Sequence, residues 1–349
     1  MESRRSSNAR LQRALCTLLF LVAVAFFLLS FTAIDIPKVS SLPRRRVDQV
    51  PFADNALSAH LPADDRVTSP APENDVLVVY VYYDGVQSEE DRRASKGAFD
   101  TGKQEENPTQ SENLKFFLHH GLQSNADYLL VFNSPVPKDA NVPTKLPNVF
   151  TWTKPNECYD LGSFSAGVDR MKSEYGRAYK KYILVNASVR GPFIPTYSTQ
   201  CWTDIFLAPL SDKTKMVGIS FNCDPNHPRH VQSMVLAFDQ IGFDTAVGPV
   251  GCPKTLDEAI VGGETQLTKR LVDRGYQAAA LMTAFKGEKD YAHTCTHLDP
   301  AWKNQYFGMS FHPYEVVFLK ANRHIDDHAL AQYTKWHDNM PSTCEYHIQ

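Results

Sequence analysis

The sequence lacks the short motifs that mark several large enzyme classes. It has no GxSxG elbow, no HExxH pair and no GxxxxGK[ST] loop, which leaves a hydrolase or a sulfotransferase-like enzyme without support. It has no CxxC pair, which argues against a zinc ribbon or a thioredoxin-like site. It also lacks an excess of basic residues, since the formal net charge is −3, and nucleic acid is therefore not expected as a partner.

One long uncharged run lies near the N-terminus. Residues 14–34 are 21 residues without a charge, about 30 Å as a helix, which is enough to span a bilayer. Four arginines precede the run, so the positive-inside rule predicts a cytosolic tail at 1–13 and a lumenal remainder. A cleaved signal peptide is the alternative, but Phe31 stands at −3 to Ala33, where a small residue is needed. We therefore expect an uncleaved signal anchor and a single-pass type II membrane protein.

Six of the seven cysteines follow this predicted membrane segment. An even number in an oxidising lumen predicts disulfide bonds, but six cysteines allow fifteen pairings and the sequence does not choose among them. The one glycosylation sequon begins at Asn186, at the end of a predicted buried strand. We expect Asn186 to belong to a site, with an occupied surface sequon as the alternative.

A stem and a folded domain are predicted after the anchor. Residues 35–75 are rich in proline, alanine, serine and charge without an apolar period, which indicates a disordered or extended spacer. The domain is expected at 76–349. Its first strand is predicted at 76–83, a continuous apolar, β-branched and aromatic run of the kind that is covered on both faces.

Strands and helices alternate along the domain. Further strands are predicted at 128–132, 149–152, 182–185, 215–221 and 276–282, and helices at 112–122, 161–176, 202–210 and 256–274. The run 231–238 fits either a strand or a helix. This alternation predicts an α/β domain with a mostly parallel sheet flanked by helices and a core at about 76–285. Residues 86–111 are expected to be an insertion, and 286–349 have no predicted place in the sheet.

The segment 153–195 contains two polar loops. The first loop leads into the predicted helix at 161–176, and the second follows the predicted strand at 182–185. A loop–helix–strand–loop unit brings both loops to one edge of a parallel sheet, at the carboxyl ends of the strands, where open α/β sheets bind ligands. We therefore expect the two loops to form one ligand site.

Three motifs in this order resemble the family 2-like glycosyltransferases of the GT-A fold. The loop at Asn156–Gly162 is similar to the loop that opens a helix in that family. The strand ending at Asn186 stands where the family has a strand that ends at a DxD-type site. Glu264, followed by the Arg-Leu-x-x-x-Gly-Tyr run at 270–276, is similar to the acidic residue that opens a later helix. Both polar loops also resemble the rhamnan-synthesis F-like branch. The resemblance implies a Rossmann-like GT-A fold and a nucleotide-sugar donor.

The sequence departs from that family at the DxD position, which here contains Asn186 and Ser188. These side chains can hydrogen-bond a sugar or ribose, but they carry no charge to hold Mg²⁺ or Mn²⁺ against a diphosphate. A divalent cation is therefore either absent or held by an acid from elsewhere, and no metal ligand is assigned. Arg190 could replace the cation, because a guanidinium offers a planar fork of donors to phosphate oxygens.

Sugar transfer with inversion needs a base that takes the proton of the acceptor hydroxyl. Glu264 is the predicted catalytic base, because it follows two glycines and opens a helix, where the helix dipole favours a carboxylate. The alternative is that Glu264 only serves that helix end. Asp160 is predicted to contact the donor sugar or ribose, with a role as N-terminal cap of the helix at 161–176 as the alternative.

The remaining site predictions concern donor and acceptor contacts. The predicted donor-binding set is completed by Tyr83, Asp84, Asn156, Asn186, Ser188 and Arg190. Tyr83 and Asp84 are assigned from their position at the end of the first strand, and an ion pair is the alternative for Arg190. Acceptor contacts are predicted for Asp224, His230 and Gln232, with loop packing or a metal as alternatives. The HIDDH run at 324–328 resembles a metal cluster, but a solvated charged face is the expected interpretation.

Two functions remain open from the sequence. The leading one is an inverting glycosyltransferase of the Golgi or ER membrane, which moves a sugar from a nucleotide-sugar donor to a glycan or glycoprotein acceptor in the lumen. The other is a non-catalytic lumenal carbohydrate-binding protein that kept the fold and lost the DxD site. The donor sugar, the acceptor and the linkage are not predicted.

Overall fold

The structure is a computed structural model, and it describes residues 74–85, 108–296 and 299–348. The predicted tail, the predicted membrane anchor and the predicted stem up to residue 73 lie outside the described residues, as does most of the predicted insertion. Within the described part of the chain, no helix combines the length and the apolar character needed to cross a bilayer.

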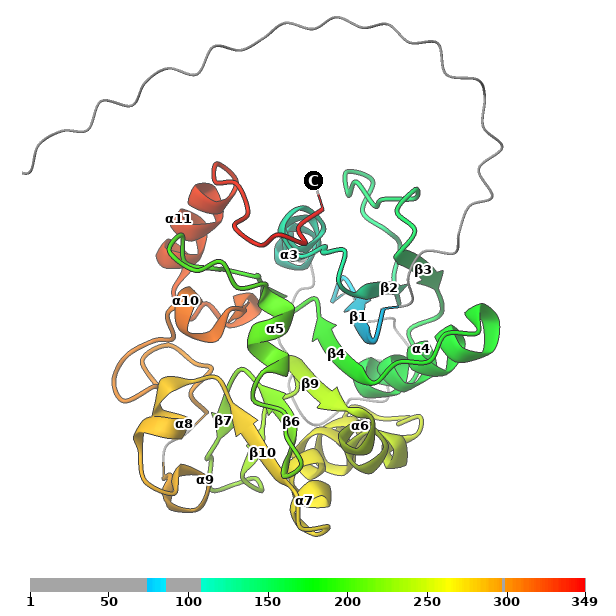
Figure 1. Ribbon diagram of the computed structural model, residues 1–349. Coiled ribbons are helices and arrows are strands. Elements are labelled where there is room, and N and C mark those ends of the chain that lie inside the picture. The colour runs from blue at the N-terminus through cyan, green and yellow to red at the C-terminus, as the bar shows by residue number, and fades with distance from the viewer. Residues whose placement is uncertain (1–73, 86–107, 297–298, 349) are drawn as a thin grey trace, which may run out of the picture. The chain divides into compact units, whose positions relative to one another are not determined.

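A seven-stranded mixed sheet forms the centre of the domain, in the order β10-β6-β9-β4-β1-β2-β3 (Figure 1). Its strands are β1 (Val76–Tyr82), β2 (Asp127–Phe132), β3 (Val149–Thr153), β4 (Lys181–Asn186), β6 (Thr214–Gly218), β9 (Val235–Asp239) and β10 (Gln277–Ala280). Neighbouring strands pair in parallel except β9, which runs antiparallel to β4 and β6. The predicted α/β class with a mostly parallel sheet is confirmed.

Two strand predictions need correction in detail. The predicted strand at 215–221 is wrong in its second half, because β6 ends at Gly218 and a separate strand, β7 (Phe221–Asn222), follows. The run 231–238 contains no helix. It begins in β8 (His230–Val231), which pairs with β7, and ends in β9 of the main sheet.

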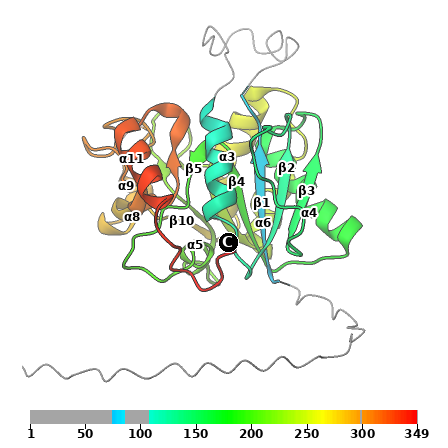
Figure 2. The same ribbon diagram turned by 90° about the horizontal axis from the view of Figure 1, so that it is seen from above.

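Helices cover both faces of the sheet, as the two views in Figures 1 and 2 show together. The main ones are α3 (Pro108–His120), α4 (Tyr159–Tyr175), α5 (Trp202–Leu207), α6 (Gln240–Ala246) and α11 (Asp327–His337). Gly167 of α4 lies so close to the sheet that an added Cβ would be 3.0 Å from the Leu129 side chain. On the opposite face, the Phe117 ring of α3 stacks on Tyr80 at 4.5 Å between ring centroids.

The predicted helix at 161–176 forms nearly as expected. It begins at Tyr159, after Cys158, and both residues have positive φ angles, of 52° and 69°. It ends at Gly176, whose φ of 65° is readily adopted only by glycine and whose amide donates to the Met171 carbonyl.

The predicted helix at 256–274 is wrong as a continuous α-helix. The chain forms a π-helical turn at Glu258–Gly263, a 3₁₀ turn at Glu264–Gln266 and then helix α7 at Leu267–Val272. Changes of helix type of this kind are frequent at functional sites. Glu264 therefore lies at a junction between two helix types.

The C-terminal segment packs on the same face of the sheet as α3 and α5. The Phe318 ring lies 5.2 Å from the Trp202 ring of α5. The next two residues form β11 (Leu319–Lys320), which pairs antiparallel with β5 (Val189–Arg190) in the loop that follows β4. Gly191 permits this approach, because its φ is +155° and an added Cβ would lie 2.6 Å from the Val317 carbonyl oxygen.

Three disulfides answer the pairing question that the sequence left open. They join Cys158 to Cys252, Cys201 to Cys344 and Cys223 to Cys295. The first ties the start of α4 to the segment before the π-helical turn. The second ties the C-terminal segment to the start of α5.

Candidate functional site

A chain of hydrogen bonds joins α4, the end of β4 and β11. Asn186, the last residue of β4, donates from Nδ2 to Asp160 Oδ2 at 3.0 Å. Its Oδ1 accepts from the Ser188 hydroxyl and from the Ser188 amide. Lys320 Nζ in turn donates to Ser188 Oγ at 2.8 Å. A carboxylate and an ammonium from distant parts of the sequence are thus connected through the two side chains at the DxD position.

The two ends of this chain are charged side chains that are partly buried. The pKa of Asp160 is raised to about 6, first by burial and then by repulsion from Glu264, against the opposing effects of Lys320 and Asn186. The pKa of Lys320 is lowered to about 8, first by burial and then by Arg323, while Glu264, Asp160 and Asp299 act in the opposite direction. Perturbed groups of opposite charge in one place are typical of functional sites.

A cavity of about 490 Å³ is lined by Asp160, the carboxylate end of this chain of hydrogen bonds. Its volume is in the usual range for small-molecule sites. Its lining includes Tyr83, Asn156, Tyr159, Asp160, Leu256 and Glu264. The structure therefore brings together residues from the end of β1, the loop before α4 and the junction before α7.

The first polar loop is held in place from several sides. Lys154 Nζ donates to the carbonyl oxygens of Pro155 and Glu157, at 2.9 and 2.8 Å. The disulfide of Cys158 anchors the loop to the neighbouring segment. An added Cβ at Gly162 would lie 2.9 Å from the Gly251 carbonyl oxygen, so only glycine allows the two segments to come this close. These contacts fix the position of the loop.

Asp160 does not cap helix α4. The N-cap residue is Cys158, and it makes no side-chain cap hydrogen bond. The side chain of Asp160 instead accepts from Asn186, outside the helix. The helix-cap alternative is therefore excluded, and the role of Asp160 as a donor contact stays a prediction.

Two of the three predicted acceptor residues lie next to a polar cluster that we call the Lys320 group, which contains Asp160, Asn186, Ser188, Asp299, Lys320 and Arg323. Gln232 Nε2 donates to Asp299 Oδ1 at 2.9 Å, and Asp299 also accepts from Arg323. His230 is buried, and burial lowers its pKa while Glu264 and Asp299 act in the opposite direction. Asp224 bonds within its own loop instead, where its Oδ1 accepts from the amide and the side chain of Asn226, both at 2.9 Å.

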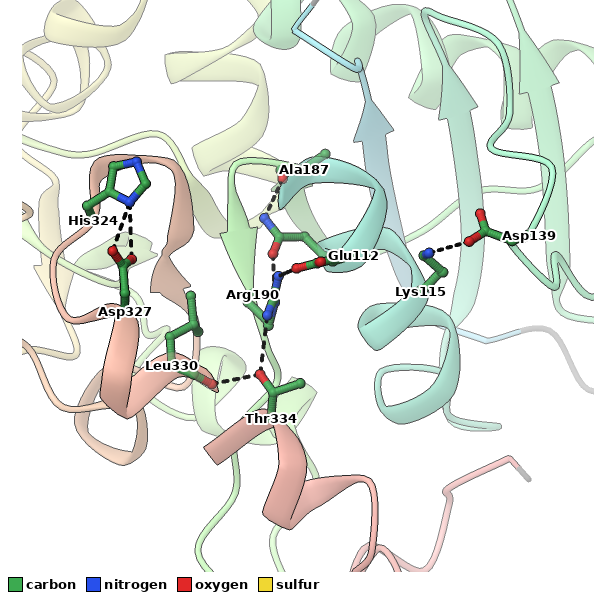
Figure 3. A network of polar contacts seen from close by, with 10 residues as sticks. Glu112, Lys115, Asp139, Ala187, Arg190, His324, Asp327, Leu330 and Thr334 are labelled. Carbon is green, nitrogen blue, oxygen red and sulfur yellow. Dashed lines mark hydrogen bonds and ion pairs between the residues drawn. The ribbon is translucent and has the colours of Figure 1, made fainter. Parts of the chain in front are cut away.

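Arg190 is directed away from the cavity, although it lies only two residues after Ser188. Its guanidinium donates to Glu112 Oε2 at 2.6 Å, to Asn113 Oδ1 at 2.8 Å and to Thr334 Oγ1 at 3.4 Å (Figure 3). Arg190 thus joins α3 to α11, and the structure does not bring it to the Lys320 group.

Two further predictions concern charged residues outside the group. The Asp84 amide donates to Ser134 Oγ at 2.9 Å, at the carboxyl ends of β1 and β2. In the HIDDH run, His324 contacts Asp327 at 3.0 Å (Figure 3) and Asp326 caps α11 by accepting from the Ala329 amide. Among the residues that the structure describes, no group of three or more His, Cys, Asp or Glu side chains is arranged to hold a metal.

Three residues of the Lys320 group were not predicted from the sequence: Asp299, Lys320 and Arg323. All three lie in the segment 286–349, which had no predicted place. One signal was present, because the apolar run at 316–319 ends at Lys320 just as the apolar strand β4 ends at Asn186. A charged residue that directly follows a strand-like run is a candidate for a strand-end site.

Comparisons with known proteins leave the family of this chain open. No family model and no curated protein matches the sequence. Among solved structures, the mannosyltransferase PcManGT from Pyrobaculum calidifontis, in complex with GDP-Man and Mn²⁺, is similar over 62% of this chain and 57% of its own, with 10% identity and a TM-score of 0.37. The WbbM bifunctional glycosyltransferase is similar over 67% of this chain and 47% of its own, with 10% identity and a TM-score of 0.28. This chain spans about half the length of those two proteins.

The raised pKa of Asp160 predicts a specific pH dependence of stability. Its ordinary value is 3.8, so the folded protein binds the proton more tightly than the unfolded chain, and stability falls as the pH rises from about 4 to about 6. Asp160→Asn removes this cost and keeps an oxygen for Asn186. We expect its Tm at pH 7 to exceed that of the wild type, by about 2–4 °C for each kcal/mol of this cost, and the difference to vanish near pH 4.

Scanning calorimetry at both pH values measures this difference. Asp169→Asn, at an exposed position of the same helix, is the matched control and should change Tm little at either pH. A lower Tm for Asp160→Asn than for the wild type at pH 7 would show that the carboxylate stabilises the fold.

Arg190 is predicted to act in stability rather than in phosphate binding. Arg190→Ala leaves Oδ1 of the fully buried Asn113 without its donor, which should lower the free energy of unfolding by about 1–3 kcal/mol. Urea denaturation measures the change. Lys269→Ala, which breaks the exposed ion pair with Asp273, is the control and should cost less than about 1 kcal/mol. Equal effects of the two substitutions would contradict the structural role.

Proposed function

We propose that this protein is an inverting glycosyltransferase of the GT-A type. It moves a sugar from a nucleotide-sugar donor to a hydroxyl of a glycan or glycoprotein acceptor. The observation that carries the proposal is the convergence of Asp160, Asn186, Ser188 and Lys320 at the carboxyl ends of parallel strands, beside a cavity that Glu264 lines. This edge of an α/β sheet is where ligands bind.

The cavity provides a place for the donor. Tyr83, at the end of β1, offers a ring for the nucleobase, and Asn156 offers an amide for ribose. Asp160 lies on the wall between these residues and the Ser188 hydroxyl, where it is available to a hydroxyl of the donor sugar. The donor would thus lie across the end of the sheet, with its diphosphate toward the charged group.

The reaction assigned to this arrangement is a single displacement. The oxygen of the acceptor hydroxyl attacks the anomeric carbon, and its proton passes to the Glu264 carboxylate. The bond from the anomeric carbon to the β-phosphate oxygen breaks, and its electron pair leaves with the nucleoside diphosphate. A positive group beside that oxygen stabilises the developing charge. Glu264 then releases the proton to solvent.

The cellular placement that we propose rests on the sequence. The uncharged run at 14–34, preceded by arginines, supports a type II anchor in the Golgi or ER membrane. Three disulfides support an oxidising compartment for the domain, since such bonds are rare in reducing ones.

Glu264→Gln tests the assigned base. Because an amide cannot take a proton from the acceptor, we expect sugar transfer to fall by about 10²–10⁴-fold, the usual contribution of a positioned base. Donor affinity should change less than about threefold, because the substitution keeps the size of the side chain. Transfer is measured with radiolabelled nucleotide sugars and a mixed glycan acceptor pool, and donor binding by calorimetry.

Glu258→Gln is the matched control, since Glu258 is exposed and lies six residues before Glu264. Unchanged turnover in Glu264→Gln would remove Glu264 from the mechanism. A wild-type protein that binds glycans but neither binds nor turns over any nucleotide sugar would instead be the non-catalytic carbohydrate-binding protein.

A further inference from the structure

At the position where a DxD site would hold a divalent cation, this protein has Asn186 and Ser188, which hydrogen-bond to other side chains. Asn186 uses both ends of its amide within the group, since Nδ2 donates to Asp160 and Oδ1 accepts from Ser188. Ser188 Oγ accepts from the Lys320 ammonium at 2.8 Å. A Mg²⁺ or Mn²⁺ ion bound to Ser188 would therefore lie against a positive charge, with only neutral ligands from the DxD position. The residues present do not fit a divalent cation there.

We propose that the Lys320 ammonium takes the place of the metal ion and binds the donor diphosphate directly, so that this protein binds nucleoside diphosphates without a divalent cation. The inference rests on the proposed function, because it names the group that receives the leaving diphosphate.

The geometry of Lys320 suits this role. An ammonium has three N–H donors, and within the described residues Lys320 makes one hydrogen bond, to Ser188 Oγ. Its backbone is fixed by the pairing of β11 with β5, opposite Val189. A charge in a partly desolvated place interacts with an anion more strongly than a charge in water does.

Arg323 adds a second positive charge close by. Its guanidinium is bonded to Asp299 and lies over the Trp302 ring, at 4.6 Å from the ring centroid. The positive charge of Arg323 lowers the pKa of Lys320. Two cations thus come from one short segment, in which Lys320 contacts Ser188 after β4 and Asp299 holds Arg323 in place.

The nearby carboxylates explain how Lys320 stays protonated when no anionic ligand is bound. Asp160, Glu264 and Asp299 all favour the protonated form of Lys320. A bound diphosphate would supply the same negative charge from the ligand side. A partly buried cation whose pKa is perturbed by its surroundings is the pattern expected of a binding residue.

Binding of nucleoside diphosphates by calorimetry tests the proposal. The probes are UDP, GDP and dTDP, each titrated into the full-length protein once with excess EDTA and once with Mn²⁺. We expect at least one of them to bind, with an affinity that changes less than about twofold between the two conditions. Lys320→Met should weaken that binding by about 10- to 100-fold, because a hydrogen bond to a charged group is lost. Lys320→Arg should retain most of it.

Lys303→Met is the control, because Lys303 is exposed in the same C-terminal segment and should leave the affinity unchanged. Wild-type binding that requires Mn²⁺, or equal affinity in Lys320→Met and wild type, would overturn the inference and leave the proposed function standing. Binding of none of the three nucleotides in either condition would count against the proposed function itself. If Lys320→Met fails to fold, two measurements still test the inference. They are the affinity of the wild type with and without Mn²⁺, and the affinity of Lys320→Arg.

Discussion

Asp160 and Lys320, a partly buried carboxylate and a partly buried ammonium, depend on the two neutral side chains between them. Asp160 and Lys320 are not in direct contact but are joined through Asn186 and Ser188. Burying a charge costs free energy unless hydrogen bonds and an opposite charge compensate. The hydrogen bonds through Asn186 and Ser188 therefore offset part of the cost of burying Asp160 and Lys320. The positive φ angles at the start of α4 and the close approaches at Gly162 and Gly191 serve to bring these four residues within reach.

The C-terminal segment belongs to the site as much as the sheet does. Arg190 joins α3 to Thr334 of α11, and Phe318 packs against the rings of α5, so the segment is docked on both sides of β11. Lys320 lies between these two anchor points. Arg190, which was predicted to bind the diphosphate, thus helps to hold the C-terminal segment that contains Lys320 against the domain.

The sequence predicted most strands of the sheet from their apolar runs, but it left the run 231–238 open between strand and helix and did not show the antiparallel β9. The rule that the carboxyl ends of parallel strands meet at one edge predicted that the loops of Asp160 and Asn186 lie together, and the resemblance to glycosyltransferases added Glu264. The sequence did not show toward which side the Arg190 side chain points, because a strand of two residues, β5, has no periodicity. It did not show Lys320, because the pairing of β11 with β5 joins residues about 130 positions apart and depends on packing around Phe318. The break in the helix before α7 falls at Gly262 and Gly263, and glycine disfavours a helix interior, so a local signal for it was present.

In the proposed complex an ammonium of the chain, rather than a metal ion, meets the donor diphosphate. This is tested by a crystal structure of the protein grown with the nucleoside diphosphate that binds and with Mn²⁺, with data collected at the manganese absorption edge. We expect a phosphate oxygen within about 3 Å of Lys320 Nζ and no anomalous peak beside the diphosphate. An anomalous peak that bridges the diphosphate to Asp160 or Glu264, with Lys320 turned away, would contradict it.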